Sequence, residues 1–214
     1  MALSKIEAVL FDLDGTVIDS YPGIQKAFDH AYFKIYSVTN QTSIKPFIGP
    51  TMNKILVKVN GETDERRIED FVSVFKNFYD TEFFKLSVLY KGMRELLVYL
   101  YEKGIKPFIV TNKRQKPTEL ITRHLDLENY FYGLYCLDSN AGYNSKAEMV
   151  KDLVSTEGLS NNNCILIGDT HQDEIAAKPN NITFIYAAYG YGDLEKTHNT
   201  IAEPLDTLKF INNI

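Results

Sequence analysis

The sequence has few cysteines, no excess of cations and no long hydrophobic run, and each deficit excludes a class of protein. Two cysteines among 214 residues, Cys136 and Cys164, are too few for a disulfide framework. Both lie in apolar runs typical of buried strands, so we expect reduced thiols in the core. Lys and Arg total 23 against 28 for Asp and Glu, a formal net charge of -5, which argues against binding to nucleic acid or to an anionic membrane.

No stretch approaches the roughly 18 apolar residues of a membrane span, so we expect a cytoplasmic protein without a membrane segment. The chain has 44% hydrophobic and 24% charged residues, and it is long enough to bury a sizeable core. This composition excludes a disordered protein. It leaves the oligomeric state open.

Short apolar runs recur between segments of helical period. The runs cover residues 8–11, 107–110, 134–137, 164–167 and 183–187. The later runs are separated by predicted helices, one following Pro117, one opened by Ser145 and a short one over residues 174–177. Strands that alternate with helices indicate a parallel sheet covered on both faces. The predicted fold class is therefore α/β, with a Rossmann-like parallel sheet core.

Residues 20–84 interrupt this alternation, because they contain no convincing strand. They show three helical stretches instead, over residues 23–36, 51–59 and 64–84. Thr51 and Thr63 are the expected N-caps. We predict a core of residues 1–19 and 85–214 and an inserted α-helical cap of residues 20–84, tethered by two segments that act as hinges.

Acidic residues follow two of the predicted strands. Asp12 and Asp14 come directly after the first strand, and Gly15 lets the chain turn so that both carboxylates gather at the strand's carboxyl end. Asp169 and Asp173 form a second pair, directly after the run at 164–167. Open α/β sheets bind ligands at that edge. The sequence therefore predicts a cluster of carboxylates there.

Two further residues carry weaker signals. Thr111 follows the run at 107–110, and Lys146 begins a predicted helix. Taken singly, each is typical of an ordinary strand-end hydroxyl or of a solvated surface charge. In combination with the acidic pairs they predict a site with carboxylates, one hydroxyl and one cation.

In these motifs the chain resembles the haloacid dehalogenase superfamily of phosphohydrolases. The motifs are, in order, Asp12-Leu13-Asp14-Gly15-Thr16, Thr111-Asn112, Lys146, and Gly168-Asp169 through Asp173. The insertion stands where capped members carry a helical cap, and Tyr189-Gly190-Tyr191-Gly192 looks most like the phosphoglycolate phosphatase and 5'-nucleotidase-like branch. The resemblance implies a phosphatase that hydrolyses a small phosphomonoester, phosphoglycolate-like or a nucleotide, with Mg²⁺ as cofactor.

The chemistry of these side chains fits that assignment. A phosphate ester is repelled by four carboxylates unless a hard cation such as Mg²⁺ lies among them. Asp12 is the candidate nucleophile, which forms an aspartyl phosphate, and Asp14 is the candidate acid that protonates the leaving oxygen and then activates water. Thr111, the backbone amide of Asn112 and Lys146 are expected to neutralise charge on the phosphoryl oxygens. The predicted metal ligands are Asp12, the backbone carbonyl of Asp14, Asp169 and Asp173.

The sequence does not identify the substrate. Arg66, Arg67 and Lys45 in the insertion are candidates to bind an anionic substrate, with Arg66 our selected residue, but each is equally typical of a solvated helix face. Tyr21 and Gln41 are similarly ambiguous. We expect His171 to be an exposed loop residue.

Two alternative functions stay open. A phosphosugar mutase of the same fold passes the phosphoryl group to a sugar rather than to water. A catalytically idle binding protein keeps the fold for contact with a partner, although the intact Asp12, Asp14, Lys146 and Asp169 argue against it. Asp14 also argues against dehalogenation, which needs no such acid.

Overall fold

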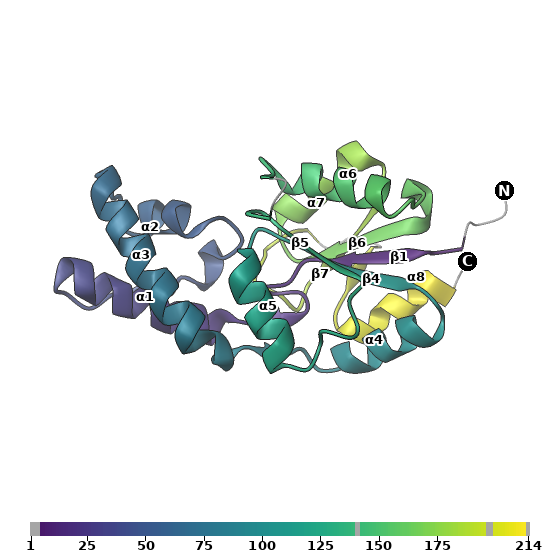
Figure 1. The fold of residues 1–214 in the computed structure, drawn as a ribbon, viewed down its shortest axis with the longest axis horizontal. Coiled ribbons are helices and arrows are strands. Elements are labelled where there is room, and N and C mark those ends of the chain that lie inside the picture. Colours follow the sequence, from purple (N-terminus) through teal and green to yellow (C-terminus); the bar gives the residue numbers. More distant parts are fainter. Residues whose placement is uncertain (1–4, 140–141, 196–198, 213–214) are drawn as a thin grey trace.

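A six-stranded parallel sheet forms the centre of the molecule in the computed structural model, which describes residues 5–139, 142–195 and 199–212 (Figure 1). The strand order is β5-β4-β1-β6-β7-β8, and each neighbouring pair is parallel. This confirms the predicted α/β class. The strands are β1 (Ala8–Phe11), β4 (Lys106–Thr111), β5 (Gly133–Cys136), β6 (Cys164–Gly168), β7 (Thr183–Ala187) and β8 (Thr200–Ile201).

Helices cover both faces of the sheet, with α6 and α7 on one side and α4, α5 and α8 on the other (Figure 1). Alternate residues of β1 enter two apolar clusters, since Val9 and Phe11 belong to one and Ala8 and Leu10 to the other. Helices α4 and α8 and strand β8 were not predicted. The helices are α4 (Met93–Glu102), α5 (Gln115–His124), α6 (Lys146–Thr156), α7 (His171–Ala177) and α8 (Leu208–Asn212), with short 3-10 turns at η3 (Asn161–Asn163), η4 (Lys178–Asn180) and η5 (Pro204–Thr207).

A group of helices lies to one side of the sheet (Figure 1). In the sequence, these helices come between strands β2 (Ile18–Asp19) and β3 (Val88–Leu89). These two strands pair antiparallel, so both tethers of the group meet at one place. The group, which we call the cap, comprises α1 (Tyr21–Tyr36), η1 (Lys45–Phe47), α2 (Met52–Asn60), α3 (Glu65–Thr81) and η2 (Phe83–Leu86). The stretch predicted as one helix over residues 64–84 is thus a helix followed by a 3-10 turn.

Of the three residues predicted to open helices, Ser145, Thr51 and Thr63, one is wrong. Ser145 caps α6, because its side chain accepts a hydrogen bond from the amide of Glu148. Thr51 stands at the N-cap position of α2, without a capping hydrogen bond from its side chain. The predicted N-cap Thr63 is wrong, since the N-cap of α3 is Asp64. The Glu62 carboxylate accepts hydrogen bonds from both following amides, which holds Thr63 in the preceding turn.

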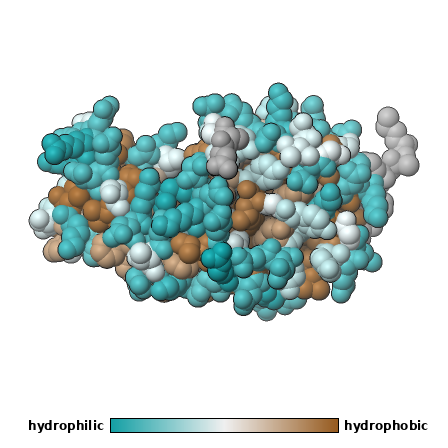
Figure 2. Space-filling view, viewed as in Figure 1, coloured by the Kyte–Doolittle hydropathy of each residue, from teal (hydrophilic) through white to brown (hydrophobic). Residues whose placement is uncertain are grey.

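Aromatic side chains pack between the cap helices, in the same apolar cluster as Val9 and Phe11 of β1. The rings of Phe28 on α1 and Phe71 on α3 meet edge to face with centroids 5.0 Å apart, and both side chains are fully buried. Hydrophobic side chains also gather on the surface over the cap helices, at the left of Figure 2.

Cys136 and Cys164 are buried free thiols, as expected, and burial raises the pKa of each to about 11. None of the described helices is long and apolar enough to cross a membrane.

Candidate active site

The carboxyl ends of the central strands bring the predicted motifs together. Strand β1 lies between β4 and β6, so Asp12 after β1, Thr111 at the end of β4 and Asp169 after β6 reach the same edge of the sheet. The Asp12 amide continues the ladder by donating to the carbonyl of Ile167 at 2.9 Å. Parallel pairing therefore converts three distant segments of sequence into one site.

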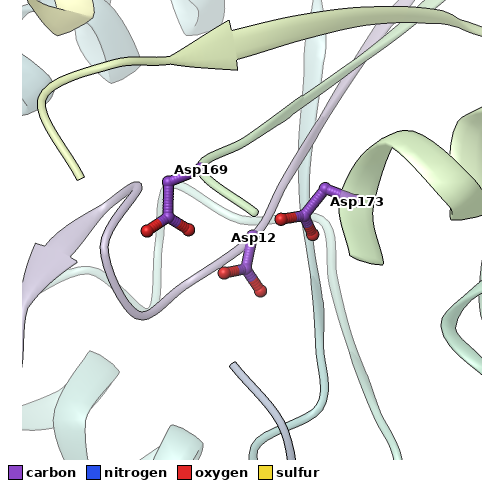
Figure 3. A group of neighbouring side chains, drawn as sticks. All are labelled: Asp12, Asp169 and Asp173. Atoms are coloured by element: carbon purple, nitrogen blue, oxygen red, sulfur yellow. The ribbon is translucent and has the colours of Figure 1, made fainter. Parts of the chain in front are cut away.

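Three buried carboxylates form the centre of this site. Oxygens of Asp12, Asp169 and Asp173 all lie within 4.8 Å of one another, and Figure 3 shows Asp12 between the other two. Burial raises the pKa of Asp12 to about 7, and burial together with the neighbouring aspartates raises the pKa of Asp169 well above its ordinary value. Burial thus favours the protonated form of these carboxyl groups unless further positive charge lies among them.

Lys146 is the cation inside the cluster. Its Nζ donates to Asp12 at 2.6 Å and to Asp173 at 2.5 Å, and its side chain is 6% exposed. Burial alone would lower the pKa of Lys146, but the two aspartates outweigh it and the pKa is raised. Lys146 is therefore a permanent positive charge beside the predicted nucleophile.

Asp14 occupies a different environment from Asp12. Its carboxylate accepts hydrogen bonds from Ser20 Oγ and from Lys113 Nζ, the latter at 2.8 and 3.0 Å. The side chain of Asp14 thus pairs with Lys113, whereas the three clustered carboxylates face one another. Our prediction assigns the backbone carbonyl of Asp14, rather than its side chain, as a metal ligand.

Lys113 is a site residue that sequence reasoning missed. Its side chain is 8% exposed, and its Nζ lies 4.6 Å from the centre of the Tyr79 ring, which α3 contributes from the cap. Burial lowers and Asp14 raises the pKa of Lys113, and the net shift is upward. The feature of the sequence that could have indicated Lys113 is its position two residues after Thr111. The Oγ1 of Thr111 accepts a hydrogen bond from the Lys113 amide at 3.2 Å.

Glycine is required where the chain passes Asp169. Gly15 has φ 89°, and a Cβ there would lie 2.2 Å from Asp169 Oδ2. A Cβ on Gly190 would lie 2.3 Å from Asp169 Cβ. The next amide, that of Tyr191, donates to Asp169 Oδ2 at 2.7 Å. Close backbone approach from both sides therefore fixes the orientation of Asp169.

Tyr191 also connects this carboxylate to the root of the cap. Its hydroxyl donates to Asp19 Oδ1 at 2.8 Å and accepts hydrogen bonds from the amides of Ser20 and Tyr21, at 2.7 and 3.0 Å. The sequence showed the motif that contains Tyr191 but not this role. One residue thus contacts a predicted metal ligand through its backbone and the start of α1 through its side chain.

A pocket of about 670 Å³ extends from the carboxylates to the cap. From the core it is lined by six predicted or newly found site residues, Asp12, Asp14, Thr111, Asn112, Lys113 and Lys146. The Asn112 side chain donates to the Gly49 carbonyl of the cap at 3.2 Å and to Gln172 Oε1 at 2.6 Å. Asn112 therefore joins three segments at the pocket.

The predicted cap cations do not reach the pocket in this structure. Among the described residues that line it, Arg66, Arg67 and Lys45 are absent. Arg66 is exposed near the start of α3, and Arg67 lies 3.6 Å from Glu62. Lys45 Nζ stands 5.8 Å from the ring centre of Tyr21. The exposed positions of Arg66 and Arg67 match the solvated-face interpretation.

The structure also shows where Gln41 and His171 lie. Gln41 is exposed and donates to the Thr39 hydroxyl. His171 is exposed, as expected, at the first residue of α7 rather than in a loop, and pairs with Glu174 at 2.9 Å. Neither lines the described pocket.

Residues 9–187 match the family described as haloacid dehalogenase-like hydrolase. The chain belongs to this family. Two relatives are a 5'-nucleotidase of Pseudomonas aeruginosa, 27% identical over 86% of this chain and 83% of that protein, and a phosphoglycolate phosphatase of Colwellia psychrerythraea, 29% identical over 89% and 88%. A crystal structure of a predicted phosphatase from Clostridium acetobutylicum is 26% identical and superposes with a TM-score of 0.86, over 99% of this chain and 100% of that one. The resemblance to the haloacid dehalogenase superfamily is thereby confirmed.

Proposed function

We propose that the chain is a magnesium-dependent phosphatase that hydrolyses a small phosphomonoester through an aspartyl phosphate on Asp12. The observation that carries the proposal is the pairing of Asp12 with Lys146 and of Asp14 with Lys113 on the wall of one pocket. The relatives described as a 5'-nucleotidase and a phosphoglycolate phosphatase support a phosphomonoester as substrate.

The donor set suits a hard cation. Three buried carboxylates lie together, only Asp12 and Asp173 of them contact Lys146, and Mg²⁺ prefers such oxygen ligands. Asp12, Asp169 and Asp173, with the backbone carbonyl of Asp14, would hold the ion. When bound, Mg²⁺ supplies positive charge that offsets repulsion between these carboxylates and the substrate phosphate.

Asp12 and Asp14 divide the chemistry between them. An Asp12 carboxylate oxygen attacks phosphorus, the bond from phosphorus to the ester oxygen breaks, and Asp14 gives a proton to the departing oxygen. Asp14 then accepts a proton from water, which attacks the phosphoryl group on Asp12 and releases inorganic phosphate. Thr111 and the Asn112 amide donate to phosphoryl oxygens, and Lys146 balances their charge.

The test is phosphate release from p-nitrophenyl phosphate. We expect activity with MgCl₂, loss of activity with excess chelator and recovery when Mg²⁺ is restored, while Ca²⁺ substitutes poorly because its looser coordination disturbs positioning. Asp12→Asn should lose about 3 kcal/mol or more of transition-state stabilisation, roughly a hundredfold in rate, because an amide is a poor nucleophile. The exposed Asp70 provides a matched control, since Asp70→Asn should leave the rate unchanged. Equal rates in chelator and Mg²⁺ would contradict the mechanism.

A further inference from the structure

The cap side of the pocket is mainly apolar. Seven of its lining residues are isoleucine, valine, methionine or phenylalanine, and three of them lie on successive turns of α3. They are Ile24, Ile48, Met52, Ile55, Ile68, Val72 and Phe75. The space beyond the catalytic aspartates is therefore lined by groups that contact hydrocarbon favourably and offer no charge to a substrate.

The cations on the core side are already paired. Lys146 binds Asp12 and Asp173, and Lys113 binds Asp14. Arg114 makes two hydrogen bonds to Asp80 of α3, at 3.0 and 2.6 Å. Because Arg114 already has a bidentate carboxylate partner, binding a second anion there would require that ion pair to be disrupted.

The cap contributes little net charge to the pocket. Among the described lining residues of the cap, Lys76 is the one cation and Glu69 the one anion, and both side chains are exposed. An exposed lysine is screened by solvent, and Glu69 brings the opposite charge to the same pocket lining. Among the residues that the structure describes, the pocket thus lacks a desolvated, unpaired cation for a carboxylate or a second phosphate on the substrate.

From this distribution we infer that the preferred substrate is the phosphomonoester of an uncharged, mainly apolar alcohol, whose hydrocarbon part lies against α2 and α3. This inference rests on the proposed phosphatase function and specifies its substrate class. It disfavours phosphoglycolate and pyrophosphate, whose second anionic groups would have to lie in the apolar half of the pocket.

The first test is a chain-length series on the intact protein in saturating Mg²⁺. We expect kcat/KM to rise from ethyl through butyl to hexyl phosphate by about two- to fourfold per methylene, hence at least about tenfold overall. Hexyl phosphate should also exceed phosphoglycolate, pyrophosphate and AMP. A flat series, or a higher kcat/KM for any of these three compounds, would overturn the inference while leaving the phosphatase function standing.

The second test compares two valines of α3 that receive the same substitution. Val72 lines the pocket, whereas Val74 is half-buried elsewhere on the helix and packs against the apolar core. Val72→Thr should lower the ratio of kcat/KM for hexyl to that for ethyl phosphate by about threefold, because it puts a hydroxyl where hydrocarbon lies. Val74→Thr should leave that ratio unchanged. An unchanged ratio in Val72→Thr, or an equal fall in both variants, would overturn the inference.

The phosphatase function and the substrate class are overturned by different results. Absence of phosphate release from p-nitrophenyl phosphate in Mg²⁺ would overturn the phosphatase function and this inference with it. Release from that compound without a chain-length effect would overturn the inference alone. The wild-type series needs no variant, so it decides the matter even where Val72→Thr fails to fold.

Discussion

Asp12 and Asp14 are two residues apart, yet the structure gives them different electrostatic partners. Asp12 lies among buried acids and shares Lys146 with Asp173, whereas Asp14 pairs with Lys113 and Ser20. Two carboxyl groups in different surroundings can perform different steps of one reaction. For Asp12 to act as the proposed nucleophile, its carboxylate must stay ionised despite burial, and Lys146 together with a cation held by the cluster would favour that form.

At the residue scale, Asp14→Asn tests the acid role. The variant should lose about a hundredfold in kcat/KM on an alkyl phosphate, and much less on p-nitrophenyl phosphate. The reason is that nitrophenolate departs readily without a proton, whereas an alkoxide does not. Steady-state kinetics on both substrates, with Asp70→Asn as the matched control, measures the difference. Equal losses on both substrates would remove the acid role from Asp14.

At the scale of elements, a few polar contacts set how the cap meets the core. The tethers pair through β2 and β3, Tyr191 binds the start of α1, and Arg114 binds Asp80 near the end of α3. Asn112 adds a contact to Gly49. Closure of a cap over a site excludes water and strengthens its electrostatics. Since these contacts adjoin the pocket, the placement of α3 and the shape of the substrate space depend on the same residues.

The beginning of α3 allows a direct test of its cap residue. Asp64 accepts a hydrogen bond from the Arg67 amide at 3.1 Å, so Asp64→Ala should reduce the free energy of unfolding by about 1 kcal/mol. Thr63→Ala should change it by less than about 0.5 kcal/mol, because Thr63 lies outside the helix. Urea unfolding of both variants checks the pair. A larger loss for Thr63→Ala than for Asp64→Ala would restore the assignment made from the sequence.

At the scale of the whole molecule, the sequence predicted what depends on local pattern. Apolar runs and helical periods predicted the parallel sheet and the inserted helices, and Gly15 predicted the turn that follows the first strand. Lys113 escaped prediction because its role depends on Asp14, 99 residues away in sequence, and on a ring from the cap. The charged cap residues were selected by type alone. Only the packing of α3 shows that Val72 faces the pocket while Arg66 does not line it.

Burial of the acidic cluster also makes a prediction for the stability of the whole chain. Burial raises the pKa of Asp12 from 3.8 to about 7, so between these values the folded protein retains a proton that the unfolded chain releases. The metal-free protein therefore loses stability from this group as the pH rises from about 4 to about 7. A bound divalent cation favours the ionised carboxylates and offsets the loss.

Mg²⁺ should consequently stabilise the protein more at pH 7.5 than at pH 5. We expect the rise in Tm on adding MgCl₂ to be larger at the higher pH by roughly 5 °C, given about 2 to 4 °C per kcal/mol for a chain of this size. Thermal unfolding in MgCl₂ and in chelator at both pH values measures it. Asp12→Asn should shrink the difference, because the amide does not titrate, whereas Asp70→Asn should preserve it. The same rise in Tm at both pH values would mean that the Asp12 carboxyl group is not coupled to metal binding.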